Sequence, residues 1–257
     1  MKYLLTILLL SLALPVFAGL DFTGTDPTKG ITTSEQIPQL DYATFIFHIN
    51  PDTITGDTFE VISFNAVGVL AESQNIYVNN SKLNFRTEGI SIFGSASDGI
   101  WSVPISANTD QFVCARWRIG GSGTIPDVWI NGVDQTVSLI SSPSSVDGHV
   151  TSFMQVGTRG GFVYSTGFNA FDGEINAVAI HTSDIGDQAC KFITMDRTKT
   201  VIQDIEADSL AYYWRLDEQP LGAKTATTTY QNSATSSRIT LGFFDQLSAV
   251  GETFLSK

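Results

Sequence analysis

The sequence predicts an all-β fold, either a sandwich of two sheets or a barrel. Apolar and polar residues alternate along most of its 257 residues, which is the pattern of half-buried strands. Gly, Asn, Asp or Ser bounds each alternating run, and such residues favour turns. A helical pattern appears in one short segment only. The sequence therefore predicts one large all-β domain or two smaller ones.

The predicted strands are short and follow one another closely. In the first of them Phe45, Phe47 and Ile49 share one face, and His48 lies on the opposite face. Asn131-Gly132 stands between two alternating runs and predicts a tight two-residue hairpin with Trp129 buried beside it. The runs that we interpret as strands are residues 43–50, 58–65, 82–87, 99–105, 111–119, 126–130, 133–140, 151–158, 175–182 and 211–217.

One helix and one polar segment interrupt this series. Ser183 or Asp184 can cap a short helix that continues to about Phe192. Residues 223–238 include the low-complexity run TATTTYQNSATSS, which predicts a loop or linker.

Residues 1–18 have the features of a signal peptide that is cleaved after Ala18. Lys2 precedes an apolar run that is shorter than the roughly 20 residues of a membrane-spanning helix. An uncleaved anchor is the alternative. We expect a secreted, extracellular or cell-surface protein whose mature chain is residues 19–257 and has no transmembrane segment.

The mature chain is strongly acidic. Removing Lys2 leaves 13 basic residues against 26 acidic ones, so the net charge changes from −12 to −13. This charge excludes nucleic acid and anionic lipid as partners and suits divalent cations or neutral glycans. Cys114 and Cys190 form a disulfide in an oxidising compartment, or remain as two buried thiols.

The motifs of common catalytic sites are missing from the sequence. No His-x-x-x-His, Cys-x-x-Cys or Gly-x-Ser-x-Gly spacing occurs, so zinc and serine-nucleophile chemistry have no support. Asp172 and Glu174 are two residues apart and would share one face of a strand, as paired glycosidase carboxylates do. The same spacing arises when a turn residue and a solvent-facing Glu open an ordinary strand.

The order of several motifs resembles the laminin-G-like, concanavalin A-like jelly-roll family. The motifs are WRIGGSGTIPDVWINGV, FMQVGTRGG, NAFDGEINAVAIHTSDIGDQ and YYWRLDE, with GLDFTGTD near the start. The resemblance is strongest over residues 43–218. It implies a single domain of two curved antiparallel sheets and one short helix, with ligand loops at the rim of the concave sheet. It implies no particular activity, because this fold carries lectins, adhesion modules, hydrolases and lyases.

The catalytic residues of that family do not carry over. Laminarinase-type members have Glu-Ile-Asp-x-x-Glu along one strand, whereas Glu174 here is followed by Asn176 and Ala179 at the other two acid positions. The Gln-x-His strand of the alginate lyases is also missing, because Ala179 precedes His181 by two. The sequence therefore predicts no catalysis.

The loop between two later strands is the best candidate for a binding site. Arg159, Phe162, Tyr164 and Phe168 stand there among Gly and Ser, and aromatic faces pack on sugar rings while Arg bonds hydroxyls. The alternative is that the two phenylalanines fold back and plug the core. By resemblance and by charge, calcium is the expected cofactor, with Asp21, Asp172 and Asp217 as candidate ligands unless they are merely solvated.

We therefore expect a secreted, non-catalytic module that binds a glycan, a cell-surface polysaccharide or another surface partner. The first alternative is a structural or receptor-binding protein of a virion or cell surface, which would use the fold for self-assembly or a protein partner. The second is a divergent glycoside hydrolase or lyase, which would need carboxylates from separate strands.

Overall fold

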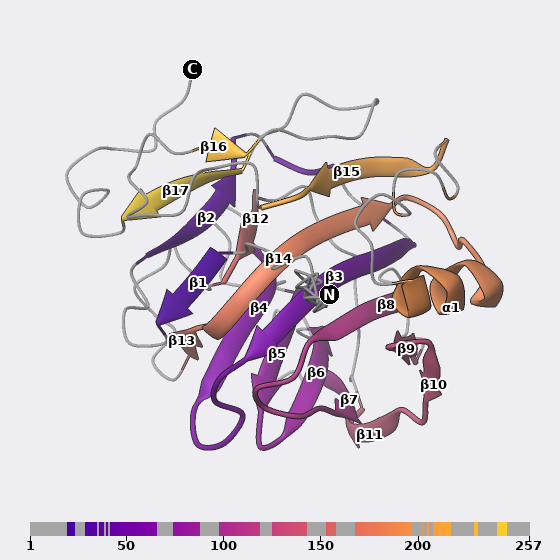
Figure 1. Ribbon diagram of the computed structural model, residues 1–257, viewed down its shortest axis with the longest axis horizontal. Helices are drawn as coiled ribbons and strands as arrows, with labels where there is room; N and C mark the ends of the chain where they lie inside the picture. The colour runs from indigo at the N-terminus through magenta and orange to yellow at the C-terminus, as the bar shows by residue number, and fades with distance from the viewer. Residues whose placement is uncertain are drawn as a thin grey trace, which may run out of the picture.

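The computed structural model describes a two-layer β-sandwich with a short helix, so the predicted all-β jelly roll is confirmed (Figure 1). The described residues are 20–23, 29–34, 36–38, 40, 42–65, 74–87, 98–118, 125–142, 153–157, 168–196, 202, 205, 208–216, 229–230 and 241–245. Among them, no helix combines the length and the apolar character needed to span a bilayer.

The first sheet has seven strands, and β14 and β3 lie at its centre. Its order is β1-β14-β3-β8-β9-β10, and β15 pairs with β14 beyond the end of β1. All its pairings are antiparallel. The strands are β1 (Leu20–Thr23), β3 (Ala43–Pro51), β8 (Gln111–Trp117), β9 (Asp127–Ile130), β10 (Val133–Gln135), β14 (Asp172–His181) and β15 (Leu210–Trp214).

The second sheet has ten strands in the order β11-β7-β6-β5-β4-β12-β2-β17-β16, with β13 beside β4. Only the short β13–β4 contact is parallel. The strands are β2 (Lys29–Thr33), β4 (Thr58–Asn65), β5 (Gln74–Asn79), β6 (Lys82–Thr87), β7 (Gly99–Pro104), β11 (Ser138–Ser141), β12 (Phe153–Val156), β13 (Phe168–Ala170), β16 (Thr229–Tyr230) and β17 (Leu241–Asp245).

Large aromatic and branched side chains from both sheets form the core. Phe45 and Phe85 each meet the ring of Trp117 edge to face, at centroid distances of 6.4 and 5.8 Å. Trp117 also meets Trp101, so rings from both sheets converge between the layers. The alternation predicted for residues 43–50 is confirmed, because Phe45, Phe47 and Ile49 face this core.

The predicted hairpin at Asn131-Gly132 is also confirmed. Both residues have positive φ, 52° and 81°, as a two-residue turn between β9 and β10 requires, and Trp129 is buried. A Cβ at Gly132 would collide with the side chain of Met195 on the helix, so any larger residue at this position would force Met195 to move.

The predicted residue ranges of one strand, the helix and one loop differ from the structure. Residues 133–140 form two strands, because the chain leaves the first sheet after β10 and joins the second as β11. The helix α1 (Asp187–Asp196) starts later than predicted and ends later. Asp184 accepts a hydrogen bond from the amide of Gly186 in the preceding turn instead of capping the helix. Within the polar segment 223–238, Thr229–Tyr230 forms β16.

Candidate functional site

The outer face of the first sheet has two chemically different halves. Helix α1 covers one half, where Ile46, Cys114 and Trp129 make a second apolar cluster with Cys190 and Ile193 of the helix (Figure 1). The other half carries polar side chains of β1, β3 and β14. A ligand site on this sheet therefore belongs to the polar half.

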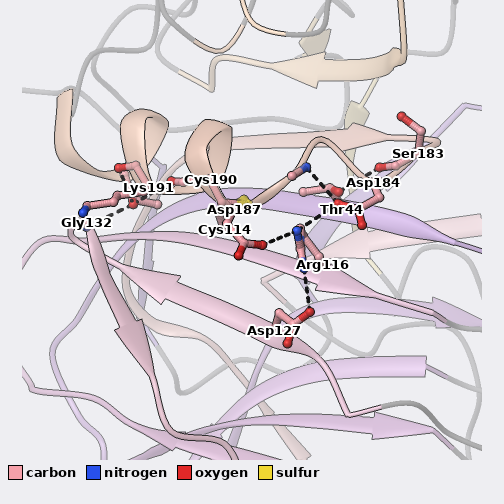
Figure 2. The surroundings of a disulfide bond; sticks show 12 residues. Thr44, Cys114, Arg116, Asp127, Gly132, Ser183, Asp184, Asp187, Cys190 and Lys191 are labelled. Atoms are coloured by element: carbon pink, nitrogen blue, oxygen red, sulfur yellow. Dashed lines mark hydrogen bonds and ion pairs between the residues drawn. A yellow bond between two sulfur atoms is a disulfide. The ribbon is translucent and has the colours of Figure 1, made fainter.

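A disulfide fixes α1 on the sheet. Cys114 of β8 bonds to Cys190 of α1, and their Cα atoms are 5.4 Å apart (Figure 2). The hydroxyl of Thr194 accepts a hydrogen bond of 3.0 Å from the amide of Gly132, so the helix also contacts the β9–β10 turn. The helix is thus tied to the sheet at two points.

Arg116 holds the N-terminal side of α1 by charge. Its guanidinium reaches Asp127 at 2.7 Å, Asp184 at 3.1 Å and Asp187 at the start of the helix (Figure 2). It also lies over the Trp129 ring, 5.0 Å from the ring centroid. These carboxylates raise the pKa of Arg116 although its burial opposes that change. Because the arginine is mostly buried and its partners are exposed, this cluster is a structural clamp.

His48 faces outward, as predicted, and it is buried there. Its ring stacks on Phe112 of the neighbouring strand at a centroid distance of 3.9 Å, and Nε2 lies 3.0 Å from an Asp110 oxygen. This histidine therefore joins β3 to the loop before β8.

Two carboxylates from separate strands meet at the far end of the same face. Asp21 of β1 stands directly opposite Glu174 of β14, and both are exposed. Although the side chains are exposed, partial burial of their carboxyl groups is the first cause that raises the pKa of each, and neighbouring acids, Asp52 among them, raise it further. Gly173 precedes Glu174 in β14, and glycine is required there because any Cβ would strike the backbone of Asn50. Sequence analysis missed this pair, since only the pairing of β1 with β14 creates it.

This corner was also the predicted calcium site. Asp172 lies opposite Thr23, close to Asp21, whereas Asp217 lies outside the described residues. Within the described part of the chain, no three acidic or histidine side chains come close enough to share a metal ion. Calcium binding at this corner therefore stays a prediction, and the accumulated negative charge would favour a cation.

An open pocket lies at one end of the sandwich, where the loop after β7 meets the β9–β10 turn. It has a volume of about 270 Å³. Its lining has hydroxyl and amide side chains over an apolar floor and no charged residue: Pro104, Ile105, Ser106, Thr109, Gln111, Ile130, Asn131 and Gln135.

The side-chain amide nitrogens that line the pocket donate hydrogen bonds to the backbone around it. Two side-chain amide oxygens remain available to accept hydrogen bonds from a ligand. Gln111 donates to the backbone oxygen of Ser106 at 2.8 Å, and Gln135 donates to that of Val133 at 3.0 Å. Asn131 donates to the backbone oxygen of Asp110 and accepts from the backbone amide of Phe112. Within the described residues, the side-chain oxygens of Gln111 and Gln135 accept no hydrogen bond. The pocket thus offers acceptors to a ligand with hydroxyl groups.

The predicted loop site cannot be placed beside this pocket. Arg159, Phe162 and Tyr164 lie outside the described residues. Phe168 begins β13, and its side chain is likewise outside the description.

Comparisons with known proteins give structural likenesses only. No family model and no curated protein matches the chain. Among solved structures, it is similar to a heptameric SAP-like pentraxin from Limulus polyphemus, with 12% identity, 90% of this chain and 95% of that chain covered, and a TM-score of 0.47. A putative carbohydrate binding protein from Bacteroides ovatus has 16% identity, coverages of 85% and 58%, and a TM-score of 0.47.

A third similar structure is the enzymatically active domain of tailspike protein 2 from bacteriophage CBA120. It shares 12% identity over 79% of this chain and 30% of that chain, with a TM-score of 0.48. The resemblance is one of fold. The strand pairing described above establishes that fold independently, and the sites are defined by this chain's own residues.

Proposed function

We propose that this protein is a secreted, non-catalytic module that binds a neutral glycan in the pocket at the end of the sandwich. One observation carries the proposal: an open pocket of about 270 Å³ in an acidic chain is lined only by uncharged side chains, some with free acceptors. Apolar side chains form a floor for the C–H groups of a sugar, and the amide oxygens of Gln111 and Gln135 accept from its hydroxyls. The volume suits one sugar ring.

A glycan array with and without chelator identifies the ligand, and calorimetry then tests the pocket. Gln135→Ala removes one hydrogen bond, worth about 1 kcal/mol, and should weaken binding by roughly fivefold to tenfold. Gln188→Ala is the matched control, because this exposed glutamine of α1 does not line the pocket. Unchanged affinity in Gln135→Ala, with a ligand confirmed on the array, would remove the pocket from the proposal.

We retain the loop of Arg159, Phe162, Tyr164 and Phe168 as a second contact surface for the same glycan. Tyr164→Ala should remove one stacking face, worth on the order of 1 kcal/mol, and weaken binding about tenfold or less. The melting temperature should stay the same. A large drop in melting temperature would instead identify Tyr164 as part of the core.

Hydrolysis is the second candidate, because the structure brings Asp21 and Glu174 together from separate strands. Residues directly opposite on antiparallel strands have Cβ atoms about 5 Å apart, so the two carboxyl groups can approach each other as a catalytic pair must. A reducing-sugar assay on the array ligands separates the two functions. Turnover that Glu174→Gln abolishes would establish a hydrolase, whereas binding without turnover supports the lectin-like role.

Secretion is the remaining part of the proposal. The basic start, the apolar run and the small residues before Gly19 support it. Mass spectrometry of the exported protein should find Gly19 as the first residue, and a retained leader would favour a membrane-anchored form.

A further inference from the structure

The polar half of the outer face carries one cross-strand row of side chains. Asp21 of β1 stands opposite Glu174 of β14, which stands opposite Asn50 of β3. Ile49 and Ile175 face the core, so their neighbours Asn50 and Glu174 face outward. Three strands thus place two carboxylates and one amide in a single line.

A β-bulge adds a second amide beside this row. The register of β14 against β3 shifts between Ile175 and Ala177, and Asn176 is the extra residue. Its side chain is buried, and neither its nitrogen nor its oxygen makes a hydrogen bond of normal geometry. It still lies near enough to Glu174 for its amide to oppose the rise in that carboxyl's pKa. The side-chain oxygen of Asn50 is also buried without a partner.

The charge of this corner is uncompensated. Neither Asp21 nor Glu174 forms an ion pair within the described residues, and Asp52 and Asp172 add further negative charge. Buried amide groups without partners and uncompensated carboxylates both cost free energy that a suitable ligand would recover. A cation that donates several hydrogen bonds would recover both costs.

We propose that this corner binds a primary ammonium group, with Asp21 and Glu174 supplying charge and Asn50 and Asn176 supplying oxygen acceptors. An ammonium has three N–H donors and no acceptor, which matches this set of oxygens. Two sources provide the same chemistry, an amino sugar and a lysine side chain of a protein partner. This site is separate from the neutral-glycan pocket.

NMR titration of the isotope-labelled protein tests the proposal, with protonated glucosamine, glucose, N-acetylglucosamine and lysine amide as probes. Glucosamine, lysine amide or both should shift the backbone amides of Asp21 and Glu174, and the two uncharged sugars should not. Binding by glucosamine alone indicates an amino-sugar ligand, and binding by lysine amide alone indicates a protein partner.

Asp21→Asn and Glu174→Gln should each weaken the amine about tenfold or more, because each removes one charge next to it. The control is Asp134→Asn, which removes an exposed charge on β10 at the opposite edge of the sheet and should have no effect. Equal shifts with glucose and glucosamine, unchanged affinity in both variants, or displacement of the amine by calcium at equal concentration would overturn the proposal. The pocket variant Gln135→Ala should bind the amine as the parent does. The proposal for this corner and the proposal for the pocket can therefore be refuted separately.

Discussion

Arg116 is one of the residues that attach α1 to the first sheet. Three carboxylates from β9, from the turn before the helix and from the helix itself converge on one guanidinium. Without that cation the same carboxylates would repel each other in a small volume. The Arg116 side chain therefore converts a repulsion between carboxylates into a net attraction.

Arg116→Met should lower the free energy of unfolding by roughly 2 kcal/mol, because it removes charge-assisted hydrogen bonds from a mostly buried group. The loss, measured by urea denaturation, should be larger at low salt, where the remaining carboxylates repel more. Arg116→Lys keeps the charge without the planar fork and should lose less. Equal stability of Met variant and parent would show that the clamp contributes nothing.

Glu174 should make the protein less stable as pH rises, whereas an acid in a salt bridge makes a protein less stable as pH falls. The pKa of Glu174 is raised in the folded protein, so its favourable contribution is complete below the unfolded pKa of about 4.3 and is lost as pH rises through the folded value. Glu174→Gln should thus melt at a higher temperature than the parent at pH 7. The two proteins should melt together near pH 4.

Calorimetry at both pH values checks this difference. Asp134→Asn provides the comparison, because it removes one exposed charge far from the acidic corner. A Glu174→Gln protein that is less stable than the parent at pH 7 would contradict the expected effect of the corner.

At the scale of elements, the covalent link between β8 and α1 closes a long segment of chain. Cys114 and Cys190 are 76 residues apart, and a loop of that length restricts the unfolded chain by roughly 4 kcal/mol in the entropy model. The Cys114→Ala and Cys190→Ala double variant should lose about 2–4 kcal/mol in denaturant unfolding. The parent under a reducing agent should behave like the variant, and a reductant-insensitive parent would show that the thiols are free.

Strand positions could largely be predicted from the sequence, and strand pairing could not. Alternation of apolar and polar residues located β3, β4 and β6 closely, although β3 is buried on both faces. β5 escaped notice because its sequence places Ile76, Tyr77 and Val78 in a row, so no clear alternation appears. The change of sheet after β10 depends on tertiary packing that no local pattern records.

The same distinction applies to the sites. Asp172 and Glu174 were recognised as neighbours in one strand, and they do open β14. Asp21 is far away in sequence, and only the β1–β14 register brings it to Glu174. The pocket is likewise assembled from β7 to β10 and the loops between them, and the one motif in its lining, Asn131-Gly132, predicted a turn and no ligand site.

For the whole molecule, net charge should govern association. The chain carries −12, so like molecules repel at low salt. Several large apolar side chains are nevertheless exposed, including Leu139 and Ile140 on the edge strand β11. Light scattering should therefore show a monomer at low ionic strength and weak association as salt is added. A stable trimer or filament at low salt would favour the structural alternative.

The Cys114–Cys190 bond also determines what a protease can release. Every peptide bond between the two cysteines lies inside a covalent ring that contains the β9–β10 turn and all of β14. One cut in that ring produces two polypeptides that remain a single molecule until a reductant separates them. The ligand sites of a nicked protein thus stay attached to one another, and only electrophoresis under reducing conditions reveals the damage.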